Sequence, residues 1–304
     1  MRSFFLLLVV SFTLYGSPNN KDLLSLIYQQ SDTLLKEVQL IKKHFGITKE
    51  AKPKKINTKM LTRHTRGRAY EIFSKVNILR VKNGLPTVEP PNMEPTTELN
   101  AKYTYGQLER LLAEIHILKF HFGINKKVKP SKISSHKTVA DTYNYLGRVS
   151  AELDTINGEA FTPSHVFSEA MRIYEDMGAI LLHLEKDDYT IPPRKLKQAK
   201  PQDTYELALD LLNTLKSLIL QSGIKSIDFY AFERTNVTPS DVYEITQLIL
   251  SELQVIKASI GLSHETTRGA VYTVGKTPAD AAQVMGWLNA KAELIKNLHQ
   301  RGGK

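Results

Sequence analysis

The chain of 304 residues contains no cysteine. It can therefore form no disulfide, no thiolate metal site and no thiol nucleophile, and it offers no cysteine for a lipid anchor. Beyond its start it also has no apolar run near the roughly 20 residues that a membrane-spanning helix requires. An apolar core must hold the fold together, and a hydrophobic fraction of 41% and a charged fraction of 24% are typical of a globular protein.

The sequence also lacks the motifs of the common enzyme classes. It has no nucleophile elbow, no metal-binding histidine pair and no glycine-rich dinucleotide turn. The tripeptide Gly275 to Thr277 resembles the end of a phosphate-binding loop, but Ala270 stands where that loop has its first glycine. We therefore predict a protein that is not an enzyme, with no catalytic residue, no cofactor and no metal ion.

The start of the chain has the layout of a secretory signal peptide. Arg2 precedes an apolar run of about 12 residues, which is too short to span a membrane, and Gly16 and Ser17 follow it. A retained anchor and a chance apolar start are the alternatives. We expect cleavage after Gly16, so that residues 1–16 are removed and the protein is soluble in the bacterial periplasm or cell envelope.

One phrase occurs twice. IKKHFGITKEAKPKKI at residues 41–56 and LKFHFGINKKVKPSKI at residues 118–133 are identical at ten of sixteen positions. An aromatic residue stands sixteen positions before each histidine, and a glutamate follows the aromatic nine positions later. The same spacing recurs with variations along the chain, in copies that begin with Tyr28, Tyr70, Tyr105, Tyr143, Phe167, Tyr205, Tyr243 and Ala282.

Each copy predicts one amphipathic helix. Apolar residues stand at offsets 0, 3, 6 or 7, 10 and 13 from the aromatic, which keeps them on one face of an α-helix. Thr238, Pro239 and Asp241 form a helix start with a cap, a first-turn proline and an acid near the positive end of the dipole. Glycines eighteen residues after the first position predict left-handed helix ends at Gly46, Gly123, Gly223 and Gly261.

The copies predict an all-α fold of eight amphipathic helices in a repeat of about 38 residues. The first four copies match the last four, so we expect two tandem four-helix bundles, residues 17–157 and 158–304, with a continuous α-solenoid as the alternative. Most connections have about 15 to 20 residues, which is long for a bundle. They could re-cross the length of a helix, so consecutive helices can be parallel.

Basic residues gather in the segments after the two copies of the phrase. Between Lys42 and Arg68 there are ten lysines or arginines and one acid, and the net charge of the chain is +10. Such segments attract anionic polymers or lipid headgroups, although a solvated surface would have the same composition. No aromatics are interleaved here, so nucleic acid is not the expected partner. The candidate contacts are Lys52, Lys54, Lys55, Lys59, Arg63, Arg66, Arg68, Lys126, Lys127, Lys129 and Lys132.

Aromatic residues gather in one other connection. Phe229, Tyr230 and Phe232 either close over the end of a bundle or contact a partner protein. The two hypotheses for function follow from these candidates. The first is an exported scaffold or adaptor that binds a protein or an anionic envelope polymer, with a possible contact to a membrane surface. The second is a helical-bundle receptor that holds a small ligand between its helices.

Overall fold

The computed structural model describes residues 20–97, 100–133, 136–158 and 160–302. The predicted signal peptide, residues 1–16, lies outside these ranges. The helices are α1 (Asn20–His44), α2 (Thr62–Lys82), α3 (Ala101–His121), α4 (Val139–Asn157), α5 (Pro163–His183), α6 (Pro201–Gln221), α7 (Pro239–Ser259) and α8 (Pro278–Gly302), with a 3-10 helix η1 (Phe229–Phe232) before α7. The described residues contain no β-strand. The prediction of an all-α fold with eight helices is confirmed.

The helix ends follow the predicted signals. The side chain of Thr238 accepts a hydrogen bond from the amide of Asp241, whose carboxylate accepts one in return from the amide of Thr238. Thr138 caps α4 in the same way. Prolines begin four helices, at Pro163, Pro201, Pro239 and Pro278.

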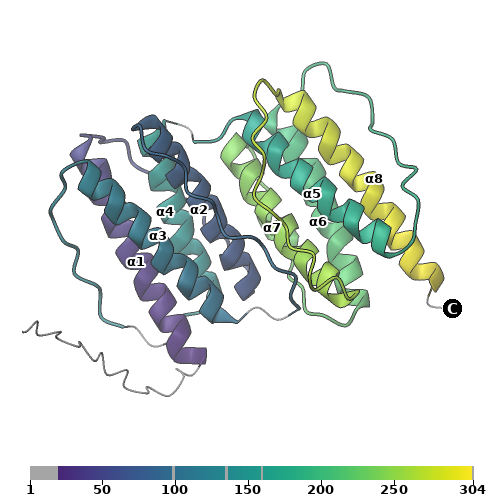
Figure 1. Ribbon diagram of the computed structural model, residues 1–304, viewed down its shortest axis with the longest axis horizontal. Coiled ribbons are helices and arrows are strands. Elements are labelled where there is room, and N and C mark those ends of the chain that lie inside the picture. The colour runs from purple at the N-terminus through teal and green to yellow at the C-terminus, as the bar shows by residue number, and fades with distance from the viewer. Residues whose placement is uncertain (1–19, 98–99, 134–135, 159, 303–304) are drawn as a thin grey trace, which may run out of the picture.

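The eight helices pack as two groups of four (Figure 1). In the first bundle α1 and α2 each pack against α3 and α4, and in the second bundle α5 and α6 each pack against α7 and α8. Each bundle has its own apolar core, and the two bundles meet where α2 packs against α7. Fully buried members of the two cores include Leu34, Leu108 and Leu146 in the first and Ile173, Leu211 and Leu288 in the second.

All four helices of a bundle run in the same direction. Tyr145 of α4 contacts Asp32 of α1, and further along both helices Glu152 of α4 contacts Lys42 of α1. The contacts between three other pairs of helices also advance in the same direction along both helices. They are Thr65–Thr104 and Arg80–Glu114 for α2 with α3, Tyr243–Glu169 and Lys257–Asp176 for α7 with α5, and Thr204–Pro278 and Thr214–Glu293 for α6 with α8. The long connections therefore act as crossovers, as the sequence allowed.

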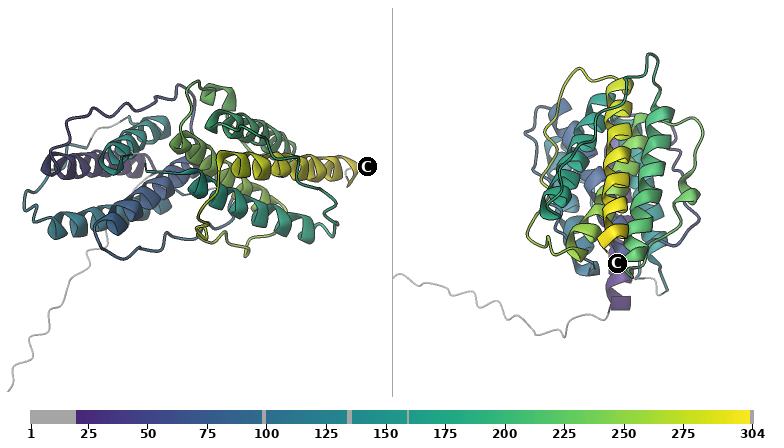
Figure 2. Two further views of the ribbon diagram at one scale, coloured as in Figure 1. Left: turned by 90° about the horizontal axis from the view of Figure 1, so that it is seen from above. Right: turned by 90° about the vertical axis from the view of Figure 1, so that its right-hand side faces the viewer.

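The connections are long enough for this return. An extended segment the length of residues 45–61 can reach roughly 55 Å, whereas a helix the length of α2 spans about 32 Å. Two further views show the connections on the outside of the helices (Figure 2). The two bundles run in opposite directions, since Arg63 near the start of α2 contacts Glu252 late in α7, while Ser74 contacts Tyr243 near the start of α7.

Parallel packing explains why the sequence repeats an acid nine residues after the aromatic. Neighbouring copies lie side by side in nearly the same register. The acid nine residues after the aromatic of one copy therefore lies within reach of a lysine side chain that stands fourteen residues after the first aromatic of a neighbouring copy. The pairs are Glu37 with Lys119, Glu152 with Lys42 at 2.7 Å, and Asp176 with Lys257 at 2.8 Å. These acids therefore form ion pairs between helices.

The two copies of the repeated phrase meet at one end of the first bundle. The rings of Phe45 and Phe122 lie edge to face with centroids 4.9 Å apart. Gly46 and Gly123 have φ angles of 65° and 70°, the left-handed conformation that closes a helix. The predicted capping role of the phrase is confirmed. Its two copies lie together because α1 and α3 are parallel neighbours.

Candidate functional site

The basic candidates divide into two sets. Arg63, Arg66 and Arg68 lie in helix α2 and are at most 9% exposed. Arg63 pairs with Glu252 at 2.7 Å and Arg68 pairs with Glu244. The prediction that these three arginines belong to an accessible basic connection is wrong. The sequence stretch looks uncompensated because its acidic partners in α7 stand 176 and 189 residues further along the chain.

We call the contact between α2 and α7 the seam. Its ionisable residues are Arg63, His64, Arg68, Glu71, Glu244 and Glu252, all of them buried. The helices approach closely at Gly67, where a β-carbon would lie 2.8 Å from the Oγ of Ser251 and 2.9 Å from the carbonyl oxygen of Gln247. A side chain at this position requires the backbone of α7 to move away.

The charges of the seam are paired within the protein, and Arg234, in the connection before α7, is a further cation beside Glu244. Burial alone would raise the pKa of Glu244, but the guanidinium groups of Arg68 and Arg234 outweigh burial and lower this pKa to about 2. The hydroxyl of Tyr143 also donates to Glu244, at 2.8 Å. Burial lowers the pKa of His64 although its ring contacts Glu252 at 2.6 Å. These charges hold the bundles together and are not available to a partner.

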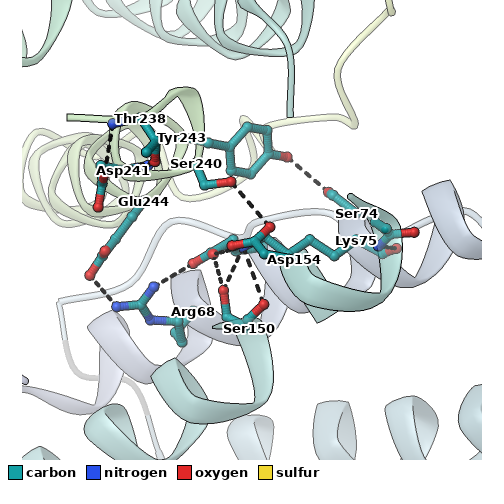
Figure 3. Close-up of polar contacts among 12 residues, drawn as sticks. Arg68, Ser74, Lys75, Ser150, Asp154, Thr238, Ser240, Asp241, Tyr243 and Glu244 are labelled. Carbon is teal, nitrogen blue, oxygen red and sulfur yellow. Dashed lines mark hydrogen bonds and ion pairs between the residues drawn. The ribbon is translucent and has the colours of Figure 1, made fainter. Parts of the chain in front are cut away.

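A cleft of about 520 Å³ opens beside the seam, between the two bundles. Lys75 projects from α2 and donates to Ser150 and Asp154 of α4, each at 2.7 Å (Figure 3). Burial raises the pKa of Asp154 and outweighs the charge of Lys75. Lys54 closes another part of the cleft by donating to both carboxylate oxygens of Asp241 at 2.8 Å. The cleft is polar, and its innermost charges are paired with one another.

The second set of cations lies on the surface of the first bundle. The backbone of Ile56 exchanges hydrogen bonds with Asn144 of α4, so the first connection runs over α4 beside the cleft. Ser131 contacts Asp32, so the second connection runs over α1, the neighbour of α4. We call this surface the basic face. Its seven defining lysines are exposed, and none forms an ion pair with an acid among the described residues, although Lys55 lies near Asp141: Lys52, Lys55, Lys59, Lys126, Lys127, Lys129 and Lys132. Lys54, by contrast, is occupied by Asp241.

The aromatic candidates also divide. Phe229 and Phe232 are fully buried in the second core, and the hydroxyl of Tyr205 donates to the carbonyl oxygen of Phe232 at 2.5 Å. Because both rings are buried, Phe229 and Phe232 are not available as contacts for a partner, and this corrects their assignment as candidate protein contacts. Only Tyr230 is exposed, at 63%, on the rim of a hollow of about 620 Å³ between η1 and α6.

Sequence reasoning missed the acidic half of the seam. Glu71, Glu244 and Glu252 supply its negative charge, and none was a candidate. One signal was present, because the first turns of α2 read TRHTRGR and have no apolar stripe. A helix that is polar there and still belongs to a folded bundle needs polar partners from elsewhere in the chain.

Within the described residues, no group of three or more histidine, aspartate or glutamate side chains could hold a metal ion. None of the helices in the described part of the chain has the length and apolar character to cross a membrane. Comparisons with protein-family models, with curated proteins and with solved structures found no match. The function is therefore argued from the basic face, the seam and the cleft themselves.

Proposed function

We propose that the protein is an exported helical scaffold or adaptor of the bacterial periplasm or cell envelope, and that its basic face binds an anionic partner. The observation that carries the proposal is the difference between the two sets of cations. The arginines of the seam have acidic partners, whereas the seven lysines of the basic face are exposed and have none among the described residues.

The arrangement suits a polyanion or a charged surface better than a small anion. The lysines are spread along two connections and converge on no single point, so each makes a separate weak contact with an extended partner. A cation near an anionic surface contributes about 1 kcal/mol, and salt screens this attraction over roughly 8 to 10 Å. Several such contacts together give useful affinity without an enclosed pocket.

Charge reversal tests the proposal. The variant Lys126→Glu, Lys127→Glu, Lys129→Glu, Lys132→Glu should lose binding to isolated cell envelopes in a sedimentation assay and keep its helical content. The matched control reverses four exposed cations of the second bundle, Lys186, Arg194, Lys197 and Lys225, and should still bind. Equal loss in both variants would mean that net charge, and not the basic face, determines binding.

Export is a premise of this proposal and has its own test. Mass spectrometry of the protein from its native host should find a new N-terminus near Ser17. An intact Met1 in cytosolic protein would contradict the proposed export to the periplasm or cell envelope.

A receptor for a small polar ligand is the second candidate function, and the cleft of about 520 Å³ favours it. Ala151 lines the cleft and has no polar side chain, so Ala151→Trp would fill the space without removing a hydrogen bond. Native mass spectrometry of protein purified from its host should show a retained ligand that the variant lacks. A bare protein mass in both samples would argue against the receptor.

A further inference from the structure

Exposed apolar side chains lie near the end of the first bundle where the two copies of the repeated phrase meet. We call this group the apolar tip and define it as Phe45, Ile117, Phe120 and Phe122. Phe120 is 85% exposed, Ile117 46% and Phe45 40%. Ile117 and Phe120 are three residues apart on α3 and lie on one face of the helix. Phe122 is partly buried and supports the ring of Phe45.

Basic residues lie around the apolar tip. The last turns of α1 and α3 contribute Lys43, His44 and His121, all exposed. The connections that leave these helices add Lys49, Lys126 and Lys127 within a few residues. No aspartate or glutamate occurs in residues 42–49 or 115–133. Lys43 in the last turn of α1 also offsets the partial negative charge at the C-terminal end of that helix.

This combination selects one kind of partner. A soluble polyanion would pair with the lysines but would leave the phenylalanines in water. A bilayer with anionic headgroups satisfies both, because aromatic and aliphatic side chains enter the boundary between headgroups and acyl chains while the cations remain at the phosphates. An acidic protein would have to present an apolar socket as well, and no feature of the tip calls for one.

We propose that the apolar tip inserts end-on into an anionic lipid bilayer, with Phe120 and Phe45 as the inserting side chains. The inference rests on the proposed function and names the partner as a lipid surface. The tip is possible because α1 and α3 are parallel and also direct neighbours, so their C-terminal ends lie side by side. Insertion stops at the last helical turn, since Leu118 and Ile41 already belong to the core.

The experiment measures binding of the mature protein to vesicles of phosphatidylcholine, with and without phosphatidylglycerol. Phe120→Ser should weaken binding to the anionic vesicles about tenfold, because a phenylalanine that leaves water on insertion contributes at least this factor. Leu182→Ser is the matched control. Leu182 stands at the position of α5 that Phe120 occupies in α3 and is 80% exposed, but it lies in the second bundle. Its replacement should leave binding unchanged.

A second readout follows insertion directly. Because the chain has no cysteine, Phe120→Cys carries a single environment-sensitive dye, whose emission should shift to the blue with anionic vesicles. The same dye at Leu182→Cys should not shift. Vesicle binding that is lost on lysine reversal but unchanged in Phe120→Ser, with no dye shift, would overturn the apolar tip and leave the basic face standing. Absence of binding to both vesicles and cell envelopes would instead overturn the proposed function.

Discussion

The seam and the basic face use the same kind of residue for opposite purposes. In the seam, arginines are buried between α2 and α7, and Glu244 and Glu252 neutralise them. On the basic face, lysines only a few positions earlier in the sequence are exposed and have no acidic partner among the described residues. A run of positively charged residues in a sequence can therefore contribute to two different parts of the structure. Burial and the distant acids decide which part stabilises the fold and which part can meet a partner.

The largest contrast is expected when one cation is removed from each region. Arg68→Leu leaves Glu71 and Glu244 buried without their main counter-charge, and it should reduce the free energy of unfolding by about 3 to 5 kcal/mol. Lys129→Leu on the basic face should change it by less than about 0.5 kcal/mol. Denaturant titrations of the two variants measure both values. Equal losses would remove the distinction between the two regions.

A methyl group added at a glycine should have the next largest effect on stability, and only in the seam. Gly67→Ala places a methyl group against the backbone of α7 at 2.9 Å, so it should cost about 1 to 3 kcal/mol. Gly106→Ala is the control, because Gly106 is exposed in α3 with no atom near its β-carbon, and it should be neutral or slightly stabilising. A silent Gly67→Ala in the same titration would mean that α2 and α7 pack less closely than described.

Acid should weaken the seam without affecting the exposed lysines. The folded-state pKa of Glu244 is about 2 against an ordinary 4.5, so its stabilising contribution is complete above about pH 4.5 and is lost as the pH falls toward 2. Between pH 5 and pH 3 this group should account for about 2 kcal/mol of the loss in unfolding free energy. Glu244→Gln should show a correspondingly shallower pH dependence. An unchanged slope would contradict the assigned charge state.

The smallest of these effects is expected at the exposed end of α3. Gly123 has a φ of 70° and open space around it, so Gly123→Val should cost about 1 to 2 kcal/mol from backbone strain alone. Gly123→Asn should cost less, because asparagine tolerates the left-handed conformation. A valine variant as stable as the parent protein would contradict the capping role of the repeated phrase.

Local structure was predictable from the sequence, and partners distant in the chain were not. Thr238 and Gly123 mark a helix start and a helix end because caps depend on residues within one turn. The burial of Arg68 depends on Glu244, 176 residues away, and no local pattern points to that acid. For the same reason, Phe229 and Phe232 could be placed in a connection but not known to be buried.

The candidate site was predictable only in part. The lysines of the basic face follow from composition, because charge outside an apolar stripe stays in water. Their place over the neighbouring helices α1 and α4 depends on parallel helices and on connections that cross over the bundle. The sequence allowed this arrangement through its connection lengths, but an up-down-up-down bundle would have placed α1 and α3 diagonally, and Phe45 and Phe122 contact each other because α1 and α3 are neighbours.

The salt dependence of binding tests the central claim most directly, namely that the exposed lysines meet an anionic surface while the buried arginines hold the bundles together. The measurement is the association constant of the mature protein with anionic vesicles or isolated cell envelopes at increasing salt, followed beside its unfolding free energy. We predict that binding falls by at least about tenfold between about 50 and 500 mM salt, because exposed charges are screened, while the unfolding free energy changes little, because the seam is buried. Absence of binding at low salt, or binding that salt does not weaken, would contradict the account.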